Sequence, residues 1–302
     1  MRYERDRRSP LPWAAMLASP DEARSDLYLS AAAYLFGPLL LGVVLRIVPL
    51  TRIPGVGAVV VVVLPLVTTV LVPWLLIRYR KERLRDYGLA GPSPVFAQGV
   101  LVAAPILAAS LLVAAVAADT PARLPVAGLA VGGTVVAFLE RLASWVGLTL
   151  LAVYAAVKAR DAFRSDPRYL RRAVVEIARV LAIIAAVATA LLALSTTVNG
   201  GTAPIVVQLL VLPLAVAGAV ALTYRGLTPG QLTSRAILLT PVVLLAIRPF
   251  VLTFDALSFV SGIWNAVLLA GIGLVVAAFV EARRSAWAPL GLAVAVAAFS
   301  GL

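Results

Sequence analysis

The chain of 302 residues is 62% hydrophobic and only 13% charged, and it carries a net charge of +12 at pH 7. This composition excludes an ordinary soluble protein. The sequence contains no His and no Cys, so the commonest ligands of zinc, copper and iron are missing, and disulfides and thiol catalysis are excluded. We therefore expect no cofactor and no bound metal.

Long apolar segments follow one another along the chain. About twenty apolar residues are needed to cross the hydrocarbon core of a bilayer, where only helices and closed barrels satisfy their backbone hydrogen bonds. The sequence therefore predicts an all-α, polytopic transmembrane bundle of about eight spans plus a short C-terminal helix. It forms a single membrane domain over residues 27–302, preceded by an interfacial segment over residues 1–26. The predicted spans are 27–45, 56–77, 95–118, 126–157, 173–198, 205–224, 236–253 and 257–280, and the last apolar piece is 286–302.

The basic residues predict an orientation. Of the 26 Lys and Arg residues, 20 fall in the N-terminal segment and in alternate loops, 3 fall in the other loops and 3 fall inside spans. Because cytoplasmic loops carry an excess of Lys and Arg, this split places the N-terminus in the cytoplasm, with the chain in the cell (plasma) membrane. The positive charge is expected to face anionic lipid headgroups rather than nucleic acid.

Charged residues are also predicted inside the hydrocarbon, where a charge at a helix centre costs about 2.5–3.5 kcal/mol. Glu140 and Arg141 lie near the middle of the fourth segment. They do not face each other on one helix, so they either meet partners in a buried polar site or reach a headgroup region on a tilted or broken helix. Arg248 precedes Pro249, which leaves a backbone carbonyl without its helical partner. Its guanidinium either satisfies that carbonyl or binds an anion, and Asp255 could draw it toward the surface.

The residues needed for the familiar hydrolytic mechanisms are missing. Ser–His and Cys–His pairs are excluded by composition. The two lysines, Lys81 and Lys158, belong to basic clusters that are expected to face the cytoplasm, which leaves no Ser–Lys site. An intramembrane carboxylate pair has no candidate beyond Glu140. We therefore expect a protein that is not an enzyme.

Three segments carry a resemblance to a known family, namely Arg83–Leu89, Tyr224–Pro241 and Gly273–Pro289. Residues 80–302, most closely over 220–302, resemble the CAAX protease and bacteriocin-processing (CPBP) family of intramembrane metalloendopeptidases. The resemblance implies the membrane-helix fold of that family, with an active-site cleft between the sixth, seventh and eighth spans.

The sequence departs from the family at every catalytic motif. The first motif of the family is two glutamates with an arginine four residues after the second, the next is Phe-x-x-x-His, and the last supplies His with Asn or Asp. The resemblance places these motifs, in chain order, at Val220, Ala221 and Arg225, at Leu244 and Arg248, and at Ala293 and Ala297. With the metal ligands and the general base gone, the resemblance implies the fold without the protease chemistry. Arg225 is then a helix-end residue or an anion contact.

The leading functional hypothesis is a non-catalytic membrane protein that holds a partner helix, a lipid or an isoprenoid tail in the former active-site cleft. Three alternatives stay open. The chain is a membrane subunit of a larger complex, a transporter or flippase that uses Glu140, Arg141 and Arg248, or an active CAAX-type endopeptidase with an unrecognised site. A membrane-protein partner is expected in the subunit hypothesis.

Overall fold

The computed structural model describes residues 17–47, 56–89, 94–117, 132–162, 170–198, 203–225, 235–250 and 256–299. Over these residues the fold is all-α, and it contains no strand. The α-helices are α1 (Pro20–Ile47), α2 (Val56–Leu66), α3 (Val72–Tyr79), α4 (Val95–Val102), α5 (Ala104–Ala117), α6 (Gly132–Ala162), α7 (Leu170–Val198), α8 (Ala203–Arg225), α9 (Arg235–Ile247), α10 (Ala256–Arg283) and α11 (Trp287–Phe299). Short helical turns of other types are η3 (Val67–Leu71), η4 (Leu84–Tyr87) and η6 (Arg248–Phe250).

Each predicted apolar segment contains one or two of these helices. Proline accounts for two places where a predicted span is divided. Pro65 and Pro73 flank the wider π-helical turn η3 between α2 and α3, and Pro105 lies at the start of α5, just after α4 ends. Proline has no N–H to donate to the preceding turn, so a continuous α-helical ladder is interrupted at these positions.

The first helix extends beyond the predicted span into the predicted interfacial segment, because α1 starts at Pro20. Ser19 explains this start, because its hydroxyl and its backbone N–H both donate to the Glu22 carboxylate, at 2.9 Å and 3.0 Å. The backbone N–H of Glu22 points back to the Ser19 hydroxyl at 3.4 Å. Such a reciprocal cap stabilises the first turn of a helix.

The chain is an integral membrane protein with multiple apolar helices. Among the described residues, three helical stretches are long and apolar enough to cross a bilayer, at Val62–Tyr79, Val135–Ala162 and Phe259–Val280. Shorter apolar helices accompany them, including parts of α4–α5, α7, α8, α9 and α11. The predicted helical bundle is confirmed at this level, and the number of crossings stays a prediction.

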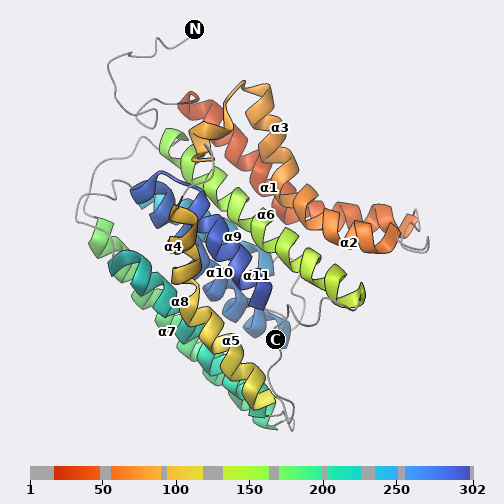
Figure 1. Cartoon of the computed structure of the whole chain (residues 1–302), viewed down its shortest axis with the longest axis vertical. Helices are drawn as coiled ribbons and strands as arrows, with labels where there is room; N and C mark the ends of the chain where they lie inside the picture. Colours follow the sequence, from red (N-terminus) through yellow and green to blue (C-terminus); the bar gives the residue numbers. More distant parts are fainter. Residues whose placement is uncertain are drawn as a thin grey trace.

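Helices α6 and α10 form the centre of the bundle. Helix α10 packs against α7, α8 and α9, while α6 packs against α1, α2, α9 and α11. Figure 1 shows α1–α3 on one side of this centre and α4, α5, α7 and α8 on the other. The longest buried stretches of the core are Leu151–Val157 of α6 and Ile272–Val280 of α10, and α1, α5, α8, α9 and α11 add further buried residues. The outward faces keep many large apolar side chains exposed, which suits a lipid environment.

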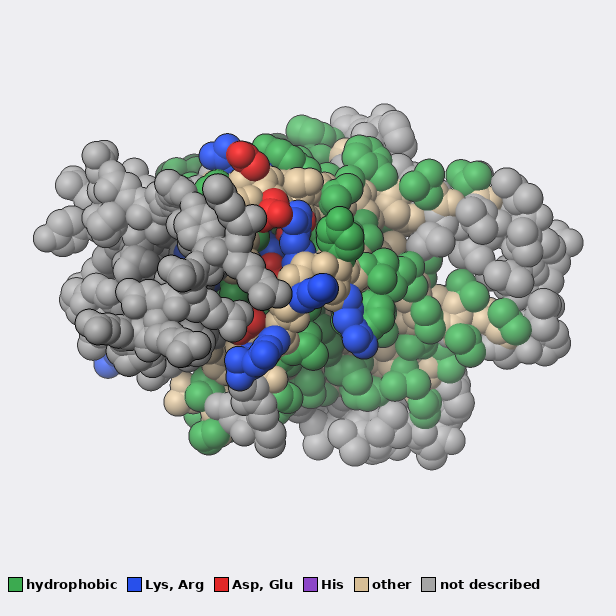
Figure 2. All heavy atoms as spheres, turned by 90° about the horizontal axis from the view of Figure 1, so that it is seen from above, with side chains coloured by type: hydrophobic (Ala, Val, Ile, Leu, Met, Phe, Trp, Pro, Cys, Tyr) green, Lys and Arg blue, Asp and Glu red, His purple; other side chains and the backbone are tan. Residues whose placement is uncertain are grey.

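The start of α1 and the ends of α3 and α6 lie at one end of the bundle, where their charged residues meet (Figure 2). The end of α10 joins them, since the Ala286 N–H donates to the Gly88 carbonyl at 3.2 Å. Lys, Arg, Asp and Glu side chains gather at this end, surrounded by apolar side chains. The sequence analysis assigned the segments at these four helix ends to the same side of the membrane.

Two glycines let α4 and α11 approach each other closely. A Cβ atom on Gly99 of α4 would overlap the carbonyl group of Ala288, and one on Gly291 of α11 would overlap the carbonyl of Phe96. Backbone atoms cannot move aside as a flexible side chain can, so only glycine fits at this crossing.

We predict that Gly291→Ala lowers the stability of the bundle by about 1–3 kcal/mol, because the added methyl group forces α4 away from α11. Thermal unfolding of the purified protein in detergent measures the change. Val294→Ile is the matched control, since it adds one carbon to a half-buried position of the same helix. Equal stability of the two variants would contradict the close crossing.

Candidate functional site

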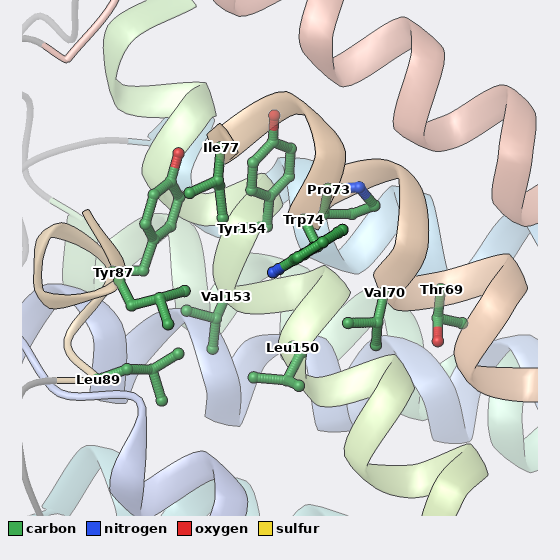
Figure 3. Close-up of a pocket in the computed structure, with 11 residues that line it drawn as sticks. Thr69, Val70, Pro73, Trp74, Ile77, Tyr87, Leu89, Leu150, Val153 and Tyr154 are labelled. Carbon is green, nitrogen blue, oxygen red and sulfur yellow. The ribbon is translucent and has the colours of Figure 1, made fainter. Parts of the chain in front are cut away.

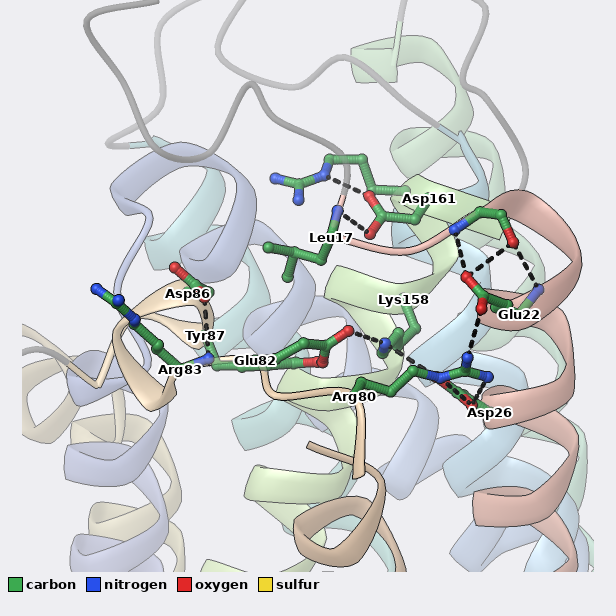
Figure 4. Close-up of polar contacts among 12 residues, drawn as sticks. Leu17, Glu22, Asp26, Arg80, Glu82, Arg83, Asp86, Tyr87, Lys158 and Asp161 are labelled. Atoms are coloured by element: carbon green, nitrogen blue, oxygen red, sulfur yellow. Dashed lines mark hydrogen bonds and ion pairs between the residues drawn. The ribbon is translucent and has the colours of Figure 1, made fainter. Parts of the chain in front are cut away.

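A buried lysine lies at the centre of the charged end of the bundle. The Lys158 side chain on α6 is completely buried. Its ammonium group lies 3.0 Å from the Asp26 carboxylate of α1 and 2.6 Å from the Glu82 carboxylate, which follows α3. Both carboxylates are themselves almost fully buried (Figure 4). One cation therefore joins three segments that are far apart in the sequence.

Arg80 extends this cluster toward the surface. Its guanidinium donates to Asp26, with the shortest contact at 2.9 Å, and to Glu22 at 2.7 Å. The hydrogen bond to Asp26 is the main reason that the pKa of Arg80 is raised. Hydrogen bonds from Ser19 lower the pKa of Glu22, so this carboxylate stays ionised. We call Glu22, Asp26, Arg80, Glu82 and Lys158 the ion-pair cluster.

Two tyrosines cover the inner side of the ion-pair cluster. The rings of Tyr87 and Tyr154 stack with their centroids 5.5 Å apart. The Tyr87 hydroxyl donates a short hydrogen bond to Glu82, and the Lys158 ammonium lies 5.7 Å from the centre of the Tyr154 ring. Burial raises the pKa of the Tyr87 phenol, and the charge of Glu82 raises it further. The phenol therefore stays protonated and remains a donor to Glu82.

The segment after α3 turns back toward α6 because of its local backbone conformation. Lys81 has a φ of 55°, in the left-handed region, and this residue ends the helix. The Arg83 N–H then donates to the Asp86 side chain at 3.0 Å, which starts the turn η4. Gly88 ends η4 with a φ of 76°. Glu82 and Tyr87 are thereby directed inward while the neighbouring basic side chains face outward.

An apolar cavity lies directly below the two tyrosines. It has a volume of ≈ 70 Å³, is partly open to the surface, and is lined by residues of η3, α3, η4 and α6 and by Leu89. Tyr87 and Leu89 lie at one end of it, and Thr69 and Val70 lie at the other (Figure 3). The remaining lining residues are Pro73, Trp74, Ile77, Leu84, Leu150, Val153 and Tyr154.

The π-helical turn η3 shapes the far end of the cavity. The hydroxyls of Thr68 and Thr69 donate back to the carbonyl of Pro65, at 3.1 Å and 2.6 Å. These hydroxyls are therefore occupied locally, and Thr69 presents little polar surface to the cavity. Turns of this kind are frequent at functional sites of helical proteins.

Basic side chains are exposed on the two segments that line the cavity, α3 and the turn to η4. The Arg78 guanidinium lies 5.2 Å from the ring centre of Trp74, which is a lining residue with 41% of its surface exposed. Lys81, Arg83 and Arg85 follow, and all three are exposed. Of these four cations, Arg85 alone forms an ion pair with another described residue, Asp86, at 3.9 Å. We call Arg78, Lys81, Arg83 and Arg85 the basic rim.

The ion-pair cluster is suited to holding helices together. Burying an ion costs several kcal/mol unless a partner compensates it, and each of the three carboxylates has a cation partner. Within the described part of the chain, no group of three or more His, Cys, Asp or Glu residues could hold a metal ion. A second contact strengthens the same helix ends, since the Leu17 N–H donates to the buried Asp161 at 3.0 Å.

The structure places the predicted polar residues at separate positions. Glu140 is exposed on α6, while its neighbour Arg141 is half-buried and its Nε atom has no hydrogen-bond partner among the described residues. Arg225 is exposed at the end of α8. Arg248 is half-buried, with its guanidinium 5.0 Å from the ring centre of Tyr34 on α1. Asp255 lies outside the described residues.

The positions that the CPBP resemblance assigns to catalytic motifs lie on α8, α9 and α11 and, for Arg248, in the turn η6 after α9. On α8, Val220 is buried and Ala221 is exposed. On α9, Leu244 is buried, and on α11 both Ala293 and Ala297 are buried. Helices α8 and α9 both pack against α10, whereas α11 packs mainly against α4 and α6. None of these positions lines the cavity described above.

The comparisons with known proteins do not identify the chain: no family model, no curated protein and no solved structure matches it. The CPBP family therefore gains no support from them, and the resemblance stays a prediction.

The sequence analysis missed the ion-pair cluster. It assigned Lys158 to a basic cluster that faces the cytoplasm and did not foresee that the structure buries this residue completely. The overlooked signal was the presence of acidic residues in strongly basic surroundings, with Asp26 just before the first apolar run and Glu82 between Lys81 and Arg83. Their spacing along the chain gives no hint of the pairing, because three separate segments contribute.

We predict that Lys158→Met destabilises the protein by about 3–5 kcal/mol, because it leaves Asp26 and Glu82 buried beside each other with one fewer cation. The exposed lysine gives the matched control, and Lys81→Met should change stability by about 0.5 kcal/mol or less. Thermal unfolding in detergent compares the two variants. If both unfold like the wild type, the cluster does not hold the helix ends together.

Proposed function

We propose that the protein is a non-catalytic, multi-pass membrane protein that binds a membrane lipid. In this proposal the apolar cavity takes part of the hydrocarbon chain and the basic rim holds the anionic headgroup. The observation that supports it is an almost purely apolar cavity with Arg78 at its edge and three more exposed cations on the segment that follows α3.

The size of the cavity favours a chain over a helix. A helix with its side chains is about 10 Å or more across, and a cavity of ≈ 70 Å³ cannot admit one. It is larger than the space that a single water molecule needs, and its walls offer almost no polar partner for water. A short stretch of an acyl chain or an isoprenoid chain fits both the volume and the apolar lining.

The basic rim favours an anionic headgroup. Arg78 stacks on Trp74 at the edge of the cavity, and Trp and Arg at such a place are typical of the membrane–water interface. Arg78, Lys81 and Arg83 have no carboxylate at ion-pairing distance among the described residues. Each such cation attracts anionic lipid with about 1 kcal/mol. This site differs from the cleft that the family resemblance implies.

We expect Leu150→Trp to reduce lipid retention about tenfold, because the larger side chain occupies the cavity. Native mass spectrometry of the gently solubilised protein measures the retained lipid. Leu139→Trp adds the same bulk to an exposed position of the same helix and should retain lipid like the wild type. The mass of the retained species separates a phospholipid from a polyprenyl phosphate.

A double substitution tests the headgroup contact. Arg78→Gln with Lys81→Gln should reduce retention of anionic lipid and leave any neutral lipid unchanged, whereas Arg179→Gln on the exposed face of α7 should change neither. A wild-type protein without retained lipid, or a Leu150→Trp variant that retains it fully, contradicts the proposal. A co-purifying protein subunit in the same spectra would favour the alternative of a larger complex.

The same proposal places the basic end of the bundle, and the N-terminus with it, on the cytoplasmic side of the plasma membrane. Because the chain has no Cys, a single introduced thiol reports its side cleanly. Tyr79→Cys, at a position that is 79% exposed, should be labelled by an impermeant reagent only from the cytoplasmic side. Thr120→Cys, in the loop predicted to face outward, should be labelled only from outside. The reverse pattern contradicts the orientation.

A further inference from the structure

Arg248 brings a positive charge into the apolar part of the bundle. It lies in η6, directly after α9, and its side chain is half-buried. None of the ion pairs among the described residues involves it. A guanidinium without a counter-ion is costly in such surroundings, and charged residues inside the hydrocarbon are therefore functional candidates.

The neighbouring tyrosine adds a second unused donor. Tyr34 of α1 is completely buried, and its hydroxyl has no acceptor within the described residues, because the polar group beside it is the Arg248 guanidinium, which can only donate. The Arg248 guanidinium lies 5.0 Å from the centre of its ring. Buried polar groups are nearly always hydrogen-bonded, so an unpartnered phenol next to an unpaired cation calls for an explanation.

The two groups have complementary needs. A guanidinium offers only donors and a positive charge, in a planar arrangement that matches carboxylate and phosphate oxygens. The phenol offers one more donor beside it. Both side chains therefore lack the same kind of partner, a negatively charged hydrogen-bond acceptor.

We propose that Arg248 and Tyr34 form a binding site for an oxyanion, a phosphate or a carboxylate, inside the bundle. This site is separate from the cavity and from the basic rim, since neither residue belongs to them. The oxyanion arrives either free from water or as the headgroup of an amphiphile.

Binding of dodecyl phosphate and of inorganic phosphate to the full-length protein in neutral detergent tests the site, with isothermal titration as the readout. Arg248→Gln should weaken the binding of the phosphate probe about a hundredfold, because it removes a charge-assisted, bidentate contact. Tyr34→Phe keeps the ring under the guanidinium and removes only the hydroxyl, so a loss of about tenfold is expected. Arg179→Gln is the control for general loss of positive charge.

Two further variants keep the test decisive. Arg248→Lys retains the charge if the glutamine variant fails to fold, and it should bind more weakly than the wild type. Asp255→Asn removes the carboxylate that the sequence analysis placed near Arg248. If the wild type binds neither probe and Asp255→Asn gains binding, the guanidinium is neutralised within the chain and the proposal is wrong.

The probes also distinguish the source of the anion. Binding of both probes that depends on Arg248 indicates a free oxyanion, and binding of dodecyl phosphate alone indicates an amphiphile. Binding that is unchanged in both Arg248→Gln and Tyr34→Phe overturns the site. Because these variants leave the cavity intact, lipid retention there is unaffected by either result.

Discussion

The neutralisation of Lys158 is the constraint on which the charged end of the bundle depends. A fully buried ammonium group is tolerated only with anionic partners close by, and Asp26 and Glu82 supply them from two other segments. To reach the lysine, α1 must begin before Asp26, and the chain must turn back directly after α3. The capped start of α1 and the left-handed Lys81 meet these two requirements. Arg80 then balances the additional carboxylate of Glu22.

The cavity is a consequence of the same arrangement. Tyr87 donates to Glu82 and stacks on Tyr154, so these two rings are fixed at one end of the cavity. The turn η3 shapes the other end, because Thr68 and Thr69 bond to the Pro65 carbonyl. The inward direction of Glu82 also leaves Lys81 and Arg83 facing outward, next to Arg78. The paired charges inside and the exposed basic rim outside are therefore two results of one chain reversal.

Apolar run length predicted the helices well, because hydrocarbon length and backbone hydrogen bonding leave few alternatives to a spanning helix. Run length gives no start for α1, which is set by the cap at Ser19 and Glu22, outside the apolar run. Lys158 was interpreted from its basic neighbours, whereas its burial depends on Asp26 and Glu82, which are remote in sequence. Arg248 could be singled out from the sequence, because a charge in an apolar run is visible without knowledge of its neighbours, and its role stays a prediction. Its contact with Tyr34 could not be predicted, since the local sequence does not determine which helices pack against each other.

The central claim is that the ion-pair cluster positions a lipid site beneath Tyr87 and Tyr154. A high-resolution density map of the protein purified with its native lipids tests this most directly. The account predicts Lys158 between Asp26 and Glu82, together with elongated density that enters the cavity beside Trp74 and ends near Arg78. An empty cavity, or a Lys158 side chain turned out to solvent, would contradict it.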